Sequence, residues 1–192
     1  MDTDRNGEFL EILKEKLTPS RLYHSICVAE KAKHLAEIFG ADTEKAYTAG
    51  LIHDIMRYEP AEEMLKLIDE DGKHKLTDSE RKITVTLHAV AGEVYLRTKL
   101  GVTDEEILSA VRYHTTGKEK MTLLEKIIYV ADLTSEDRDY PDVSKVRETA
   151  EESLEKATLC GLSFTIESNA KQNRPIHIDT VKAYNYLAER IE

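Results

Sequence analysis

The sequence predicts an all-α protein, and three observations lead to this prediction. Apolar residues recur every three or four positions over long stretches, as at Leu22, Ile26 and Ala29, which is the spacing of one helix face. Residues that begin and end helices punctuate these stretches, and polar–apolar alternation of the kind found in strands is nearly absent. With 192 residues and 41% hydrophobic content, we predict one domain over residues 1–192, a helical bundle with a helical C-terminal extension.

Capping signals place the helix boundaries. Thr18 before Pro19 begins a helix that Gly40 closes, Ser144 begins a later one, and Asp179 is expected to cap the last. Three starts have the capping-box pattern: Thr77 with Glu80, Thr103 with Glu106, and Thr122 with Glu125. We predict helices over 7–17, 19–39, 43–57, 60–70, 78–99, 104–114, 122–133, 144–159 and 179–190, and leave 161–166 open between strand, loop and helix.

Composition excludes several classes of protein. The formal net charge of −10 argues against a nucleic-acid polymer as partner, although a metal centre can still attract a small phosphorylated substrate. The chain lacks the run of about 20 apolar residues that a membrane-spanning helix needs, and its first residues do not resemble a signal peptide. We therefore expect a cytoplasmic protein, with Cys27 and Cys160 as reduced, buried thiols.

Histidines and aspartates recur within or beside apolar runs. His53 and Asp54 form the clearest case, since both lie in the apolar segment 49–55, which predicts a buried helix. A buried carboxylate next to an imidazole is costly unless something compensates it, and a divalent cation can do so. Any one such histidine alone is more typical of a hydrogen-bonded core residue. The joint pattern favours a metal centre built from His24, His53, Asp54, His88, His114 and Asp132.

Four imidazoles and two carboxylates suit iron, manganese or zinc better than calcium. The other three histidines serve as controls. His34 lies on a polar helix face, His74 in a charged stretch and His177 in an expected turn, so we assign them no ligand role.

The order of these residues resembles the HD superfamily of metal-dependent phosphohydrolases, with His24, the pair His53-Asp54, and Asp132 as its signature. The segment 112–117 (Arg-Tyr-His-Thr-Thr-Gly) and the segment 125–132 are similar, more narrowly, to the YqeK-like proteins, the symmetrically cleaving bis(5'-nucleosyl)-tetraphosphatases. The likeness runs from about residue 17 to residue 187.

This resemblance implies an HD fold, a di-iron centre, and hydrolysis of diadenosine tetraphosphate into two nucleoside diphosphates. It implies that His24, His53, Asp54 and Asp132 hold one metal ion, and that Asp54 bridges to a second ion completed by His88 and His114. The family's usual lysine is Arg57 here, and its usual Glu-Pro is replaced by Ser135-Glu136, which leaves the corresponding acid open.

The mechanism we expect is attack by a hydroxide held between two metals, with Asp54, Arg57 and Arg138 as catalytic residues. Arg57 and Arg138 are candidates to grip the phosphates, since a guanidinium donates two parallel hydrogen bonds. Ordinary surface ion pairs are the alternative for these arginines. Thr115, Thr116 and Gly117 are further candidates for substrate contacts, and a plain helix stop is the alternative there.

Other functions compete with this one. A nucleotide phosphomonoesterase or an alarmone hydrolase would use much the same ligands, a nucleotide-sensing module would keep the fold without catalysis, and an acidic helical adaptor would bind no metal. The amphipathic first helix, with Phe9, Leu10, Leu13 and Leu17, packs either on its own domain, which we favour, or on a second copy in a homodimer.

Overall fold

The computed structural model describes residues 3–191, and over this range the chain is built of helices and loops without a β-strand. This confirms the predicted all-α class. The helices are α1 (Thr3–Lys16), α2 (Pro19–Phe39), α3 (Thr43–Ile52), α4 (Ala61–Asp71), α5 (Asp78–Lys82), α6 (Thr84–Thr98), α7 (Glu105–Tyr113), α8 (Leu123–Thr134), α9 (Val143–Glu152), α10 (Leu154–Lys171) and α11 (Ile178–Ala188).

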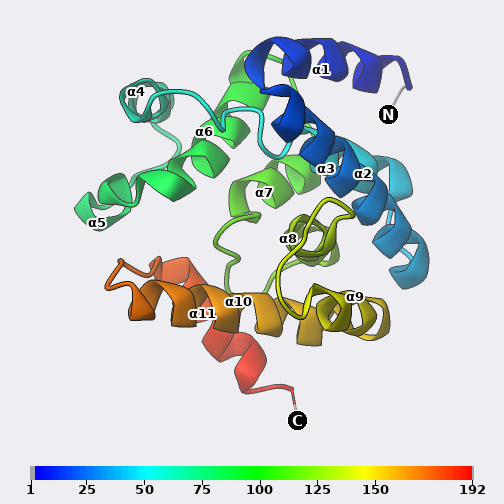
Figure 1. The fold of residues 1–192 in the computed structure, drawn as a ribbon. Helices are drawn as coiled ribbons and strands as arrows, with labels where there is room; N and C mark the ends of the chain where they lie inside the picture. The colour runs from blue at the N-terminus through cyan, green and yellow to red at the C-terminus, as the bar shows by residue number, and fades with distance from the viewer. Residues whose placement is uncertain (1–2, 192) are drawn as a thin grey trace.

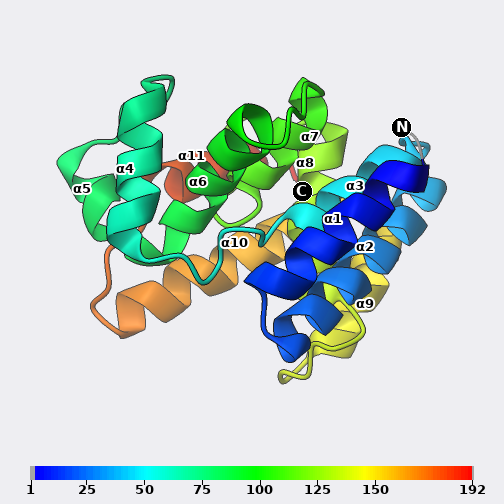
Figure 2. The same cartoon turned by 90° about the horizontal axis from the view of Figure 1, so that it is seen from above.

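The centre of the molecule is a group of five helices: α2, α3, α6, α7 and α8. α2 packs along α3 and α8, α7 packs on α3, α6 and α8, and α1 lies across one end of the pair α2–α3 (Figure 1). On the opposite side α10 packs against α8, α9 and α11, and it runs from α9 toward the side where α5 lies (Figure 2). The central helices share one apolar core, whose fully buried large side chains include Leu35, Leu51, Ile52, Ile107, Ile127 and Ile128.

The first helix packs on its own chain. Phe9, Leu13 and Leu17 are all buried, and they belong to the same core as the central helices. The apolar face of α1 is thereby covered without a second copy, as the sequence favoured. The homodimer stays a prediction.

Two of the predicted helices are interrupted. The helix expected over 78–99 breaks at Ile83, whose backbone (φ −88°, ψ 66°) leaves the helical region so that its side chain is buried while the short, polar α5 stays at the surface. The helix expected over 144–159 breaks at Ser153, which is extended and caps a new helix by accepting from the amide of Lys156. That new helix, α10, contains 161–166, so this open segment is helical.

Three predicted caps also need correction. Thr103 does not cap α7; the neighbouring Asp104 does, because its carboxylate accepts from the amides of Glu106 and Ile107. The last helix is capped by the ring of His177 instead of Asp179. The helix expected to open at Ser144 begins one residue earlier, after Asp142 in a left-handed conformation. The capping boxes at Thr77 and Thr122 are confirmed.

The two cysteines differ in exposure. Cys27 is buried as expected, whereas Cys160, in α10, is exposed, so the expected burial is wrong for this thiol. Across the described residues, none of the helices combines the length and the apolar character needed to cross a membrane.

The contact between α2 and α3 depends on a glycine. A Cβ atom on Gly50 would lie 2.8 Å from the Cα of Ala29 and 3.0 Å from the carbonyl oxygen of Val28. Both neighbours are backbone atoms, so they cannot move aside as a side-chain end would. Gly50 therefore sets how closely α3 approaches α2.

We expect Gly50→Ala to lower the free energy of unfolding by about 1–3 kcal/mol, because the added methyl group must push the two helices apart. Chemical denaturation measures this effect. The matched control is Gly7→Ala in α1, where the new Cβ has no neighbour within 4 Å and where alanine should stabilise the helix by roughly 0.5–1 kcal/mol. Equal effects of the two substitutions would contradict the close packing described here.

Candidate metal centre

His53 and Asp54 lie just beyond the end of α3. The helix predicted over 43–57 ends at Ile52, and tighter turns follow, in which the amides of Ile55 and Arg57 donate to carbonyls three residues back. The carbonyl of Gly50 is thus left for the imidazole of His53, whose Nδ1 lies 2.7 Å from it. Because a carbonyl only accepts, this bond puts the proton on Nδ1 and turns Nε2 toward the interior.

The same arrangement recurs at the end of α7. His114 follows the last residue of that helix, and its Nδ1 lies 2.7 Å from the carbonyl of Val111, three residues back. Carbonyls in the last turn of a helix lack an intrahelical partner, which makes them ready acceptors. Two separate helix ends therefore present a histidine Nε2 to one interior point, and the two rings stand 4.9 Å apart, edge to face.

The surroundings of the Nε2 atom of His53 indicate whether this site suits a metal ion. It is fully buried and makes no hydrogen bond to any of the described residues. A buried nitrogen lone pair without a partner is costly, and a divalent cation is a natural partner for it when carboxylates stand nearby. The residues present fit such an ion.

Asp54 occupies the middle of the group. Its carboxylate is 3.0 Å from the Nε2 of His88 and 3.6 Å from the Nε2 of His114, and its other oxygen is 3.4 Å from the Nε2 of His53. Burial would raise the pKa of Asp54, but these three imidazoles outweigh it and hold the pKa well below its usual value. Asp54 is therefore ionised at neutral pH, as a metal ligand must be.

His88 stays neutral. Burial, together with the nearby charges of His114 and Arg57, lowers the pKa of His88 to about 4. Its Nε2 lies 3.1 Å from the Nε2 of His114. Two imidazoles facing each other beside a carboxylate form a donor set suited to a transition metal.

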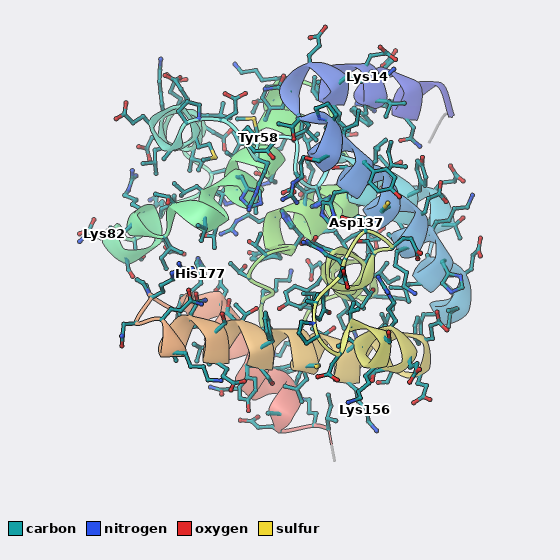
Figure 3. All side chains as sticks on the ribbon, in the orientation of Figure 1. Lys14, Tyr58, Lys82, Asp137, Lys156 and His177 are labelled. Carbon is teal, nitrogen blue, oxygen red and sulfur yellow. The ribbon has the colours of Figure 1, made fainter. Side chains whose placement is uncertain are left out.

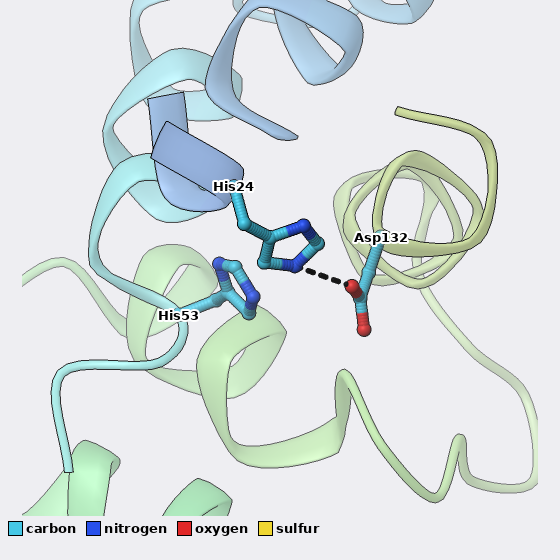
Figure 4. A group of neighbouring side chains, drawn as sticks. All are labelled: His24, His53 and Asp132. Atoms are coloured by element: carbon cyan, nitrogen blue, oxygen red, sulfur yellow. Dashed lines mark hydrogen bonds and ion pairs between the residues drawn. The ribbon is translucent and has the colours of Figure 1, made fainter. Parts of the chain in front are cut away.

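His24 and Asp132 complete the group from two further helices. Figure 4 shows the side chains of His24, His53 and Asp132 pointing toward one another from three elements, with the Nε2 of His24 2.9 Å from the carboxylate of Asp132. Burial would raise the pKa of Asp132, but its bond to His24 and the charge of Arg138 lower it. Asp132 is thus ionised too.

The six predicted residues come together at one place. Ligand atoms of His24, His53 and Asp132 lie within 4.8 Å of one another, and so do those of His53, Asp54 and His114. His88 falls outside both groups by this measure, but it contacts Asp54 and His114 directly. The role of each residue as a ligand stays a prediction.

Sequence reasoning missed Asp137. Its carboxylate lies 2.7 Å from the Nδ1 of His24 and so accepts a hydrogen bond from that side of the ring. The neighbouring Glu136 is exposed, which settles which acid of this segment reaches the site. Figure 3 places Asp137 on the segment in front of α8. The only signal in the sequence is its position five residues after Asp132.

Three arginines surround the group. One of them, Arg21, was not predicted from the sequence. It lies one helical turn before His24, and its guanidinium is 3.0 Å from the carboxylate of Asp54. Arg57 lies 3.2 Å from the Nδ1 of His88. Arg138 forms an ion pair with the carboxylate of Asp132 and donates to its carbonyl oxygen at 2.6 Å. Neither predicted phosphate-binding arginine is an ordinary surface ion pair.

Arg147 holds the segment that carries Asp137 and Arg138. Its guanidinium donates to the carbonyls of Thr134 at 3.0 Å, Ser135 at 2.7 Å and Arg138 at 2.9 Å. These bonds stabilise a loop whose backbone lacks the regular hydrogen bonds of a helix. The site therefore has a fixed wall on this side.

Some of the polar groups of Thr115, Thr116 and Gly117, which we predicted to contact the substrate, are already hydrogen-bonded within the chain. The hydroxyl of Thr116 donates to the carbonyl of Gly117 at 2.9 Å, and the amide of Gly117 donates to Tyr113 at 2.8 Å. The buried Oγ1 of Thr115, by contrast, has no hydrogen-bond partner among the described residues, and Thr115 lines a cavity of about 420 Å³.

The control histidines lie away from the group. His34 is at the surface, and His74 pairs with the buried carboxylate of Glu93 at 2.7 Å. His177 is buried, not in an open turn, and lines the same cavity as Lys82; both are labelled in Figure 3. Its ring accepts from the amide of Asp179 and lies 3.4 Å from Glu80, which joins α11 to α5. A helix cap with an ion pair accounts for that cluster.

A family model described as HD domain matches residues 21–137, a range that contains all six residues of the group. The chain belongs to the HD domain family. HD domains depend on metal ions, and the His/Asp groups described above have side chains that could hold them.

Relatives narrow this assignment. The chain is 40% identical over 183 residues to a protein of Halalkalibacterium halodurans named "Bis(5'-nucleosyl)-tetraphosphatase, symmetrical", with 94% of this chain and 96% of that one aligned. It is also 40% identical over 181 residues to the protein of that name from Bacillus subtilis, with the same shares aligned. The resemblance to the YqeK-like proteins is thereby confirmed.

A solved structure agrees in fold. It is a crystal structure from Clostridium acetobutylicum described as a predicted HD superfamily hydrolase involved in NAD metabolism. It superposes with a TM-score of 0.93 at 36% sequence identity, and the match covers 96% of this chain and 97% of that one.

We expect Asp137→Asn to weaken metal binding about 10- to 100-fold, because the carboxylate behind His24 raises the basicity of that ring and fixes its orientation. Titration of metal-free protein with Mn²⁺ in competition with a chelator measures this. Glu136→Gln, which removes the same charge one residue away at the surface, should leave the affinity unchanged. An unaltered affinity in Asp137→Asn would show that the carboxylate does not support a ligand.

Proposed function

We propose that this chain is a metal-dependent hydrolase that cleaves diadenosine tetraphosphate symmetrically into two nucleoside diphosphates. The observation that carries the proposal is the convergence of six histidine and aspartate side chains, ringed by arginines, in a chain 40% identical to curated symmetrical tetraphosphatases over 94% of its length. A phosphoanhydride substrate carries several negative charges, and this group is equipped to bind them.

We assign two divalent cations to this site and expect both to be iron. His24, His53, Asp54 and Asp132 would hold one, and His88 and His114 would hold the other together with Asp54. Such cations lower the pKa of water and neutralise charge on a phosphoryl group. The chain itself contributes ionised carboxylates, together with two imidazoles whose Nδ1 atoms are already directed to the carbonyls of Gly50 and Val111.

The arginines have a second task in this proposal. Arg21 and Arg138 each bond to a carboxylate of the site, and a guanidinium has five N–H donors, so each retains donors for phosphate oxygens. Arg57 and the free hydroxyl of Thr115 would add contacts further along the polyphosphate. In this proposal water attacks an inner phosphorus, the bond from that phosphorus to the central bridging oxygen breaks, and that oxygen leaves as part of a nucleoside diphosphate.

The products test the reaction. Purified protein reconstituted anaerobically with ferrous iron should convert diadenosine tetraphosphate to adenosine diphosphate alone, because attack at an inner phosphorus divides the molecule evenly. Ion-exchange chromatography separates the products. A mixture of adenosine mono- and triphosphate would refute symmetric cleavage. Faster hydrolysis of a mononucleotide or of a guanosine alarmone in a substrate panel would assign the site to another HD-type activity.

Variants of the second metal position test the proposed ligands. We expect His88→Ala or His114→Ala to bind one metal ion fewer per chain and to lose turnover by about a hundredfold or more, because several kcal/mol of charge stabilisation disappears. Elemental analysis and turnover are measured on the same samples. His34→Ala, at the exposed face of α2, is the control and should match the wild type. Full activity in both site variants would exclude a requirement for two metals.

A further inference from the structure

A cavity of about 580 Å³ opens beside the candidate metal centre, between the loop that follows α8 and the face of α10 that carries Cys160, Gly161 and Phe164. Its volume is within the range of small-molecule sites, about 300–1,000 Å³. The wall is largely apolar, with one arginine, and the residues that matter below are Leu133, Arg138, Tyr140, Cys160, Gly161 and Phe164.

Two aromatic rings form one side of this cavity. Tyr140 and Phe164 stack with centroids 6.3 Å apart and 23° between their planes. The hydroxyl of Tyr140 donates to the carbonyl of Leu133 at 3.0 Å, which fixes its ring. Phe164, in contrast, is 61% exposed, and an exposed phenylalanine over a hollow offers a flat apolar surface to a ligand.

The cavity is joined directly to the metal centre. Leu133, in its wall, follows Asp132 in the chain, and Arg138, also in its wall, bonds to both the carboxylate and the carbonyl of Asp132. A Cβ atom on Gly161 would lie 2.2 Å from the Cδ1 of Leu133, so α10 approaches α8 closely at this point. A molecule that touches Arg138 with a phosphate can therefore extend its other end over Phe164.

We propose that this cavity binds one purine base of the substrate, stacked on the exposed face of Phe164, while Arg138 contacts the phosphate that follows. The inference rests on the proposed function and adds to it the residues that select a nucleotide over a bare polyphosphate. Aromatic side chains stack on any base, so the site favours nucleobases as a class. Two further cavities differ from this one. The cavity beside Thr115 is lined by Lys82, Arg174, several hydroxyl groups and the imidazole of His177, and a cavity of about 300 Å³ is lined by Arg57 and His88. Among the described residues, neither has a phenylalanine or tyrosine ring in its wall.

Cys160 reports on occupancy of this cavity without any turnover. It is exposed and lines the hollow, whereas Cys27 is buried, so one thiol should react quickly with N-ethylmaleimide and the other slowly. Saturating adenosine diphosphate should slow labelling of Cys160 in the metal-loaded protein about tenfold, and inorganic tripolyphosphate should not. Mass spectrometry follows each cysteine separately. Absence of protection, or equal protection by tripolyphosphate, would overturn the proposal.

Phe164→Ala tests the stacking ring. We expect about a tenfold higher KM for diadenosine tetraphosphate, an unchanged kcat, and loss of the protection of Cys160, because the variant loses stacking but no group at the reacting atoms. Ile38→Ala, which trims another exposed apolar side chain on α2, is the matched control and should alter neither quantity. If Phe164→Ala kept the KM of the wild type and the protection of Cys160, the proposed base site would be refuted.

The two proposals can fail separately. Protection of Cys160 by adenosine diphosphate without hydrolysis of diadenosine tetraphosphate would remove the proposed reaction and keep the base site. Symmetric hydrolysis without protection would keep the reaction and remove the base site.

Discussion

The constraint on which the structure depends is a carboxylate that is buried in the interior. Asp54 is ionised and buried, and among the described residues it is stabilised by the neighbouring imidazole of His53 and by groups from other segments: the imidazoles of His88 and His114 and the guanidinium of Arg21. Removal of any one leaves part of a charge uncompensated in the interior, which proteins tolerate poorly. The central helices must therefore meet at this point, and their packing and the chemistry of the site have a common origin.

Helix ends do the positioning. His53 and His114 each follow the last residue of a helix, and each bonds through Nδ1 to a carbonyl that the helix itself leaves unpaired. One hydrogen bond thereby satisfies the helix end, fixes the tautomer and aims Nε2 inward. The early end of α3, where periodicity predicts a longer helix, is what places Asp54 in the centre instead of on a continuing helix face.

The segment after α8 contributes both to the candidate metal centre and to the proposed binding of a nucleobase. The carboxylate of Asp132 lies in the candidate metal centre, and that of Asp137 contacts His24. Arg138 bonds to Asp132 and lines the aromatic cavity, and the guanidinium of Arg147 holds this loop by its carbonyls. A loop tied down in this way keeps its side chains in register with the site without the support of regular pairing. Binding groups held rigidly lose little entropy when a ligand arrives, which favours tight and selective binding.

The sequence by itself determined the helical class, most helix starts and the six converging residues, because periodicity, capping and buried polar groups are local patterns. Only the tertiary structure decided the breaks at Ile83 and Ser153, where burial of one side chain and capping by another override helical propensity. It also decided the roles of Asp137 and Arg21. Each becomes part of the site through a partner distant in the chain, His24 or Asp54, and a contact made across space leaves no periodic trace in the order of residues.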